Sequence, residues 1–351
     1  QEIENKISNY NGIVFMLKSN KATHFKNEGK AVYGLRSEIE RIVDEVCKNG
    51  VSNVILTGIG GTIFELMSIK KIFDDYSKID CVIMNGADML IENPDWIDEH
   101  SVVITGSKSG DTPETIAACK YCRERGAEVI SLVGTNDCPL ANCSDYVVVS
   151  DIPGMTHTYL KFYLIALRFM YNNKEFDAYE KFADECRDLY ESVVKIQEKF
   201  EPIAASIADK YSNEPYQIWV GSGIVWGEIN LFTMCILEEM QWMRTRAVTS
   251  SDFFHGTLEL VEKDVPVYLI KGIGKYRPQD ERVERFLEKT TDKLVVIDLE
   301  NYKLDCFSKE FEEMLTPITF NALTRGRLAY HFERVTGHDL NIRRYYRQFE
   351  Y

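Results

Sequence analysis

The residues of greatest chemical interest form a hydroxyl-rich segment between an apolar run and a helical pattern. Residues 102–104 are apolar, three hydroxyl side chains follow at Ser107, Ser109 and Thr112, and Gly110 lies among them. A helix N-terminus presents unpaired backbone N–H groups and the positive end of the helix dipole, and glycine lets an anion approach the backbone. Serine and threonine also cap helices, but three hydroxyls exceed what one cap requires. The segment therefore predicts a site for a phosphorylated small molecule.

A glycine-rich turn precedes this segment in the chain. Gly58 and Gly60 follow a predicted strand, and Thr62 stands where a helix is expected to begin. The turn partly matches a dinucleotide-binding fingerprint, but Ile63 occupies the position of the third glycine, so the pattern is not met. We interpret the turn as one wall of the phosphate pocket, with Thr62 available as a donor. The residues expected to line this pocket are Gly58, Gly60, Thr62, Lys108 and Gly110.

Two acid–base groups stand in the second half of the chain. Glu239 lies near the end of an otherwise apolar helical pattern that begins at Trp226, and His255 lies in a predicted turn next to Gly256. A carboxylate at a helix end is usually solvated, whereas a carboxyl enclosed by apolar residues has a raised pKa suited to proton transfer. A single histidine on a loop is more often structural than catalytic. Spacing alone leaves both alternatives open for both residues.

Composition limits the classes of partner. The chain has 41 Lys and Arg against 55 Asp and Glu, a net charge of −14, which disfavours binding to nucleic acid. No run of about 20 apolar residues occurs, and residues 1–5 lack the basic start of a signal peptide, so we expect a cytoplasmic protein that does not bind membranes. The nine cysteines are expected to be free thiols. Cys119 and Cys122 fall in a helical pattern without a second ligand pair, so we expect no metal site.

The chain is predicted to be an α/β protein with two doubly wound parallel sheets flanked by helices. Short apolar runs alternate with helical patterns, such as 62–73 and 113–125, which is typical of a parallel sheet covered on both faces. The expected strands are 51–56, 81–84, 102–104, 129–133, 146–149, 218–220, 265–270 and 294–297. The expected domains are an N-terminal helical segment at 1–50, a first domain at 51–154, linking helices at 155–212, and a second domain with a C-terminal helix and tail at 213–351.

The two α/β units are spaced as a divergent repeat. The offset from Gly58 to Gly221 is 163, and the offset from Gly106 to Lys271 is 165. Nearly equal offsets favour a duplication. In the first unit, the strand that ends before Gly106 is followed by the hydroxyl-rich segment. In the second unit, the corresponding strand is followed by Lys271–Tyr276, which contains neither serine nor threonine. We therefore expect one phosphate site per chain.

Taken together, these segments resemble the sugar isomerase (SIS) domain family, as a tandem pair that covers nearly the whole chain. Residues 107–112, SKSGDT, are similar to the family's phosphate loop. Glu239 and His255 are sixteen residues apart, as are the glutamate and loop histidine in the isomerase half of glucosamine-6-phosphate synthase, whose histidine region residues 251–262 resemble. The tail at 343–351 resembles the ending of the deglycases that act on phosphorylated Amadori compounds such as fructoselysine 6-phosphate.

The resemblance implies a deglycase that cleaves a 6-phosphorylated fructosamine to glucose 6-phosphate and a free amine or amino acid. It assigns the 6-phosphate to Ser107, Ser109 and Thr112, proton transfer from C1 to C2 to Glu239, and ring opening or protonation of the departing nitrogen to His255. It also implies a homodimer with shared active sites, in which His255 acts in the partner's site. This chemistry requires no cofactor, and the expected ligand is a small-molecule sugar phosphate.

The chain departs from the family pattern at three places. Thr57-Gly58-Ile59 stands where relatives have Cys-Gly-Ser or Cys-Gly-Thr, Thr257 replaces a proline, and the last lysine is Lys309, so the synthase's C-terminal lysine has no counterpart. Two alternatives stay open. One is an aldose-ketose isomerase or an amino-sugar phosphate deaminase of the same fold. The other is a non-catalytic sugar-phosphate sensor, although residues 1–50 lack the basic character of the DNA-binding module that such sensors generally carry.

Overall fold

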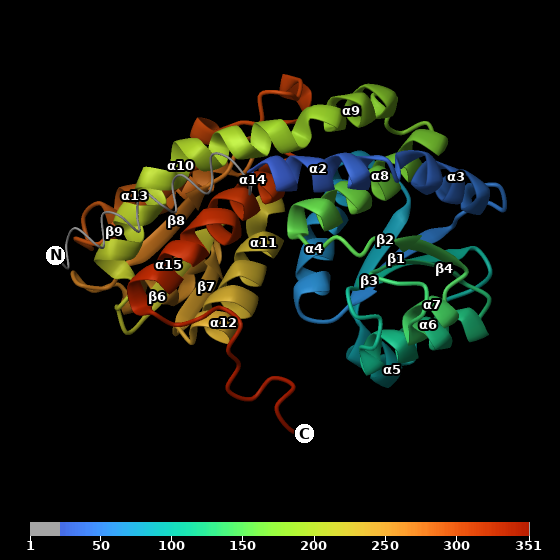
Figure 1. The fold of residues 1–351 in the computed structure, drawn as a ribbon, viewed down its shortest axis with the longest axis horizontal. Helices are drawn as coiled ribbons and strands as arrows, with labels where there is room; N and C mark the ends of the chain where they lie inside the picture. Colours follow the sequence, from blue (N-terminus) through green and yellow to red (C-terminus); the bar gives the residue numbers. More distant parts are fainter. Residues whose placement is uncertain (1–21, 351) are drawn as a thin grey trace.

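Two parallel β-sheets, one in each half of the chain, organise the computed structural model, which describes residues 22–350 (Figure 1). In this part of the chain, one sheet has five strands in the order β2-β1-β3-β4-β5 and the other has four in the order β7-β6-β8-β9. All pairings in both sheets are parallel. The predicted α/β fold with two parallel sheets is confirmed. The part of the expected N-terminal helical segment that falls on residues 1–21 lies outside the described residues.

The first sheet alternates its side chains between two apolar layers. Ile55 of β1 and Val103 of β3 face one layer with helices α5 and α6, whereas Val54 and Ile104 face the other, with α3, α4 and α8. Both central strands are buried along their full length, which explains their continuous apolar runs. The strands and helices of this half are α2 (Ala22–Tyr33), α3 (Arg36–Cys47), β1 (Asn53–Gly58), α4 (Gly61–Tyr76), β2 (Asp80–Asn85), α5 (Gly86–Glu92), β3 (Ser101–Ser107), α6 (Pro113–Glu124), β4 (Glu128–Val133), α7 (Pro139–Asn142) and β5 (Tyr146–Val149).

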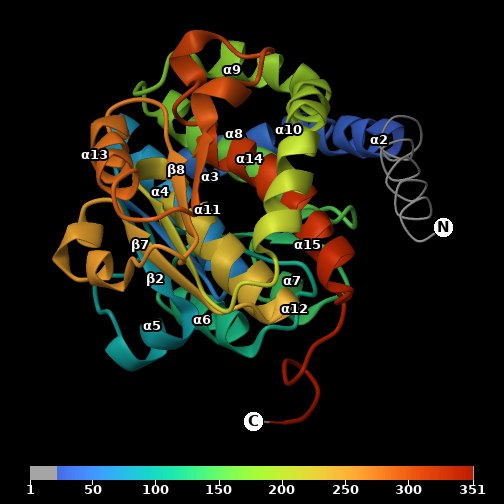
Figure 2. The same ribbon diagram turned by 90° about the vertical axis from the view of Figure 1, so that its left-hand side faces the viewer.

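Long helices separate the two sheets along the chain. They are α8 (Met155–Asn172), α9 (Tyr179–Glu185) and α10 (Leu189–Tyr211), followed after the second sheet by α14 (Thr316–Leu323) and α15 (Ala329–Thr336). Helices α10, α14 and α15 pack against one another on one side of the molecule (Figure 2). Helix α8 is apolar on almost all sides because it contacts α3, α4 and α14.

The second sheet repeats the strand order of the first, with β6 in place of β1 and β8 in place of β3. Trp219 of β6 and Tyr268 of β8 are paired in register, and their rings stack with centroids 4.0 Å apart. Strand β7 was not predicted from the sequence, because it lies at the sheet edge and buries only Val248 among its five residues. The strands are β6 (Gln217–Gly221), β7 (Thr245–Thr249), β8 (Val267–Lys271) and β9 (Leu294–Asp298), with α13 (Arg277–Leu287) between the last two.

The helix that follows β6 is continuous but changes its winding. It runs through α11 (Trp226–Asn230) and the wider π-helical segment η4 (Leu231–Glu238) into α12 (Glu239–Gln241). Such widened turns are frequent at functional sites. At the C-terminal end, the chain leaves α15 and runs past α12 towards the half that contains α5 and α6 (Figure 1). Within residues 22–350, no helix combines the length and apolar composition that crossing a membrane requires.

Candidate active site

The hydroxyl-rich loop joins the C-terminal end of β3 to the N-terminus of α6. Ser107 Oγ lies 3.1 Å from Thr112 Oγ1 and accepts a hydrogen bond of 3.0 Å from the Gly110 N–H. Thr112 is the N-cap residue of α6, yet among the described contacts its hydroxyl makes no capping bond to the helix. The capping explanation therefore does not account for Thr112. Ser107, Gly110 and Thr112 converge at the start of the helix, as an anion site requires.

The other members of this loop face outwards or fix its shape. Ser109 and Lys108 are exposed, and the Ser109 hydroxyl donates to Asp111 Oδ1. This hydrogen bond lowers the pKa of the Asp111 carboxyl. Gly110 has a φ of +67°, and a Cβ there would lie 2.3 Å from Cys138 Sγ, so no larger residue fits. The tight backbone at Gly110 is what brings Ser107 and Thr112 together.

The glycine-rich turn lies at the same edge of the sheet. Strands β1 and β3 are parallel neighbours, so Gly58 at the end of β1 and Ser107 at the end of β3 meet at their carboxyl edge. Gly60 adopts a φ of +56° as the N-cap of α4, and Thr62 lies in the first turn of that helix. Ligands of open α/β sheets bind at this edge. The fold thus brings the predicted pocket residues from two segments to one place.

The helix that carries Glu239 packs against α4. Ser68 Oγ of α4 donates to the Ile224 carbonyl over 2.9 Å, and a Cβ on Gly227 would lie 2.3 Å from the Phe64 carbonyl oxygen. Further along, a Cβ on Gly61 would lie 4.0 Å from the Sγ of Cys235, one turn before Glu239. This packing directs the end of the helix that carries Glu239 towards the glycine-rich turn.

Glu239 itself is neither enclosed by apolar residues nor fully solvated. Its side chain is 31% exposed, and Arg343 Nε donates to Glu239 Oε1 over 2.7 Å. Both residues line an open cavity of about 790 Å³ formed by residues 238–239, 242–245 and 343–346. The sequence suggested an apolar wall or solvent around Glu239, and the structure instead gives it a guanidinium partner.

The C-terminal tail contacts both candidate sites. Arg343 reaches Glu239, and Arg347 Nη2 lies 3.1 Å from Asp111 Oδ1 of the hydroxyl-rich loop. Between them, the Arg344 guanidinium lies 4.3 Å from the centre of the Trp242 ring. Sequence reasoning noted the tail only for its likeness to relatives and gave its arginines no role. The abundance of arginine at 343–347 was the one available signal.

His255 is placed apart from these groups within one chain. It ends a short turn (η5, Asp252–His255) after β7, is exposed, and is followed by Gly256 with a φ of +157°. The neighbouring Phe253 is buried and anchors the turn against the sheet. Among residues 22–350, no hydrogen bond or ion pair joins His255 to Glu239 or to the 107–112 loop.

The comparisons with known proteins agree with this architecture. Residues 52–167, which span the first sheet and most of α8, match the model of the SIS domain. Residues 52–167 therefore form a SIS domain. The chain is 28% identical over 330 residues to the fructosamine deglycase FrlB of Bacillus subtilis, covering 92% of this chain and 99% of the relative. It is 22% identical to the fructoselysine 6-phosphate deglycase of Escherichia coli, with 88% and 89% covered.

A solved structure shares the fold over almost the full length. A protein from Bacillus subtilis described as a phosphosugar isomerase superposes with a TM-score of 0.86 at 26% identity, covering 93% of this chain and all of the other. The similarity extends beyond the matched SIS domain to the second sheet. The solved structure therefore shares the arrangement of both sheets.

In the second half, a carboxylate lies beside the end of β8, the strand that corresponds to β3 in the strand order. Asp280 accepts hydrogen bonds from Ser222 Oγ (2.8 Å), Ser250 Oγ (2.6 Å) and the Gly272 N–H (3.0 Å). These donors follow β6, β7 and β8, at the carboxyl edge of the second sheet. Asp280 is fully buried, and burial raises the pKa of its carboxyl. An internal carboxylate thus accepts hydrogen bonds from donors that follow three neighbouring strands of this sheet.

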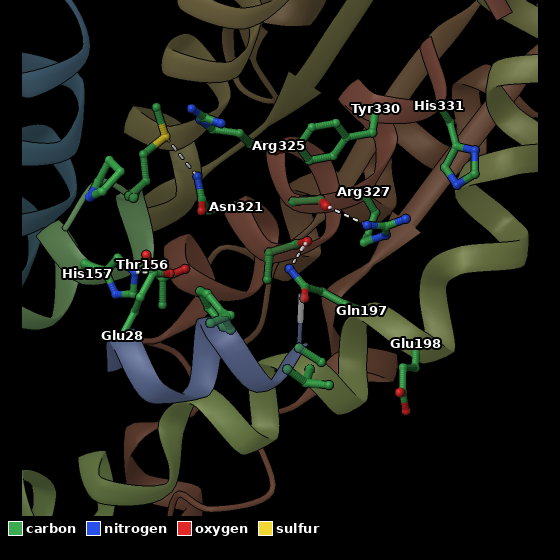
Figure 3. A pocket seen from close by; sticks show the side chains of 18 of the residues that line it. Glu28, Thr156, His157, Gln197, Glu198, Asn321, Arg325, Arg327, Tyr330 and His331 are labelled. Atoms are coloured by element: carbon green, nitrogen blue, oxygen red, sulfur yellow. Dashed lines mark hydrogen bonds and ion pairs between the residues drawn. The ribbon is translucent and has the colours of Figure 1, made fainter. Parts of the chain in front are cut away.

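A second cavity, of about 620 Å³, lies between α2, α8, α10 and the C-terminal helices (Figure 3). Several of its ionisable groups are bonded to protein partners: His157 Nδ1 lies 2.8 Å from Tyr190 Oη, and Glu201 pairs with Arg327 and with His331. Arg325 also lines this cavity, and its buried Nε has no hydrogen-bond partner among the described residues. The residues predicted from the sequence are not among its described lining residues. We therefore place the candidate active site at the carboxyl edge of the first sheet and not in this cavity.

A buried carboxyl joins the two halves near Asn321, which is labelled in Figure 3. Glu228 of α11 is fully buried and accepts hydrogen bonds of 2.7 Å from both Tyr159 Oη and Asn321 Nδ2. Burial raises the pKa of Glu228 to about 7, although both hydrogen bonds act in the opposite direction. The described residues contain no group of three or more histidine, cysteine, aspartate or glutamate side chains that could hold a metal ion.

Proposed function

We propose that this SIS-domain protein is a deglycase that cleaves a 6-phosphorylated fructosamine to glucose 6-phosphate and a free amine. The observation that carries the proposal is the packing of the Glu239 helix against α4, the helix that begins at the glycine-rich turn. Two relatives are named as deglycases of fructosamine and of fructoselysine 6-phosphate, which supports the same class of substrate.

The phosphate end of the substrate is assigned to the first sheet. Ser107 and Thr112 donate hydrogen bonds to the phosphate oxygens at the N-terminus of α6, where the helix dipole favours an anion. Ser109 joins them only when its hydroxyl turns away from Asp111, to which it donates in this structure. Gly58, Gly60 and Thr62 form the opposite wall. Lys108, which is exposed on the loop, adds positive charge near the ester. Holding the phosphate fixes the position of C1 and C2 relative to Glu239.

The chemical step is assigned to Glu239 as general base and acid. The carboxylate removes the proton from C1 of the open-chain ketose, and the electron pair forms a C1=C2 double bond while the C2 oxygen takes up a proton to give an enol. The proton from C1 then returns at C2, and the amine nitrogen loses its proton as the C1=N bond forms. The product is an imine at C1, which water hydrolyses to the aldehyde of glucose 6-phosphate and the free amine. His255 opens the ring or protonates the departing nitrogen, a role in which histidine often acts as general acid or base.

The assembly is proposed to be a homodimer with shared sites. His255 is exposed on a rigid turn, with its neighbour Phe253 buried, so its side chain is available to a second copy of the chain. In this arrangement His255 of one chain completes the site that contains Glu239 of the other. We further propose that the protein works in the cytoplasm, where such sugar phosphates are found.

The test is product release from a panel of 6-phosphorylated fructosamines that differ in their amine. We expect the wild-type protein to release glucose 6-phosphate and Glu239→Gln to release none above background. Glu238→Gln is the matched control, because Glu238 is the adjacent carboxylate and accepts a hydrogen bond from Thr245 instead. Absence of glucose 6-phosphate with every compound, or full activity of Glu239→Gln, would contradict the proposal. Release of ammonia from an amino-sugar phosphate would identify a deaminase.

A further inference from the structure

The Arg343 guanidinium is held both by Glu239 and by backbone carbonyls of the tail. Arg343 Nη1 donates to the carbonyls of Leu340 (2.7 Å) and Ile342 (3.1 Å), while its Nε donates to Glu239 Oε1. The backbone of the tail therefore sets the direction in which this guanidinium points. Among the described contacts of Glu239, the pair uses only Oε1. Glu239 itself lines the cavity.

The tail is held to the end of the same helix. Gln241 Nε2, two residues after Glu239, donates to the His338 carbonyl over 3.0 Å, and the rings of Trp242 and His338 lie 4.2 Å apart. The Arg344 guanidinium lies over the Trp242 ring, a cation–π contact. These contacts place Arg343 relative to α12 independently of its own pair with Glu239.

The far end of the tail is held to the phosphate loop through Arg347 and Asp111. Arg343 thus belongs to a segment that spans the proposed phosphate site and the proposed base. A partly exposed ion pair contributes little to folding stability, so stability alone does not explain this arrangement. A guanidinium held in a fixed direction restricts the rotamers of the carboxylate to which it donates.

From these contacts we propose that Arg343 is a positioning residue, which orients the Glu239 carboxylate for proton abstraction at C1. The proposal rests on the function proposed above and adds a residue to it. Arg343 acts through Glu239 and needs no contact with the substrate. A lysine would supply the charge without the direction, because its ammonium group lacks the planar set of donors.

The experiment compares Arg343→Gln, Arg343→Lys and Arg343→Ala in the full-length protein, with glucose 6-phosphate release as the assay. We expect Arg343→Gln to lower kcat by about ten- to a hundredfold, while KM changes little because the phosphate loop is intact. Arg343→Lys should recover part of kcat, and methylguanidine in solution should restore part of the activity of Arg343→Ala. The melting temperature should stay close to that of the wild type.

Arg123→Gln is the matched control, because Arg123 forms a similar partly exposed ion pair with Asp145 at 2.8 Å. The inference is overturned if Arg343→Gln keeps the wild-type kcat, if only KM changes, or if Arg123→Gln loses as much activity. These outcomes test the role of Arg343 when the wild type is active and Glu239→Gln is inactive. An inactive wild type or an active Glu239→Gln overturns the proposed function itself, and the inference with it.

Discussion

Arg347 and Asp111 lie 3.1 Å apart although 236 residues separate them in the chain. One belongs to the C-terminal tail and the other to the loop of Ser107 and Thr112. The conformation of this loop depends on Gly110, and the C-terminal tail contacts the loop through Arg347. This contact makes the hydroxyl-rich loop the natural place for a first test of ligand binding.

Replacing Thr112 by valine should weaken binding of the phosphate group. The change keeps the shape of the side chain but removes the hydroxyl that lies 3.1 Å from Ser107 Oγ. A hydrogen bond to a charged group contributes about 1.5–3 kcal/mol, so we expect KM to rise by about ten- to a hundredfold. Steady-state kinetics with a 6-phosphorylated fructosamine measure the effect. Thr112→Ser keeps the hydroxyl and should stay within about threefold of the wild type. Equal behaviour of the two variants would argue against a phosphate contact at Thr112.

Mixing inactive subunits should restore activity if the sites are shared. Glu239→Gln and His255→Ala are each expected to be inactive as homodimers. After subunit exchange in an equimolar mixture, the mixed dimers contain one intact site, so about a quarter of the wild-type activity should return. Activity is measured before and after exchange, and size-exclusion chromatography checks the dimers. If intact mixed dimers remain inactive, His255 does not act in the partner's site.

Replacing Glu228 by glutamine should remove a pH dependence of folding stability. Burial raises the pKa of Glu228 from 4.5 to about 7 in the folded state. The folded state therefore binds the proton more tightly, so stability is greatest below about pH 4.5 and falls as pH rises through about 7. The loss amounts to about 3 kcal/mol. Glutamine can still form hydrogen bonds with Tyr159 and Asn321, and it does not ionise, so this loss of stability at high pH should not occur.

Denaturant unfolding at about pH 5 and about pH 8 measures the effect of this substitution. The wild type should lose more stability between the two pH values than Glu228→Gln does. Glu310→Gln, which removes one side of an exposed ion pair with Lys181, serves as the control and should follow the wild type. Parallel pH profiles of Glu228→Gln and the wild type would show that Glu228 does not titrate in this range.

Removing the carboxylate of Asp280 should create an anion site in the second half. Asp280→Ala leaves two buried hydroxyls and the Gly272 N–H without their acceptor, which should lower the free energy of unfolding by about 2–4 kcal/mol. Added inorganic phosphate should raise the melting temperature of this variant more than that of the wild type. An equal response to phosphate in both proteins would mean that the donors do not form an anion cradle.

The sheets could be predicted from the sequence because their strands carry continuous apolar runs. Strands β1, β3, β6 and β8 are buried along their full length, and this burial is visible as a pattern of residue types. Strand β7 could not be predicted from an apolar run, because it lies at the edge of the sheet and only Val248 is buried among its five residues. The widened winding of η4 also left no signal, because it keeps an apolar composition that fits any buried helix.

The candidate site could be predicted only where its residues are close in sequence. The loop of Ser107, Ser109 and Thr112 is one segment, so its hydroxyls can be recognised together. The partners of Glu239 and Asp111 come from the tail, 104 and 236 residues away, and depend on tertiary packing that no local pattern contains. Phosphate binding and the role of His255 remain predictions until they are measured.

Because Asp280 is part of the chain, the hydrogen bonds at the carboxyl edge of the second sheet do not depend on a bound metabolite. The second sheet carries its anion covalently, so the bonds that close its carboxyl edge are present from the moment the chain folds. On the function proposed here, the first sheet gains the equivalent bonds only while a sugar phosphate is bound, and its stability should rise with ligand concentration. One half of the molecule would then act as a constant frame, and only the other would respond to changes in the cell's sugar phosphate pool.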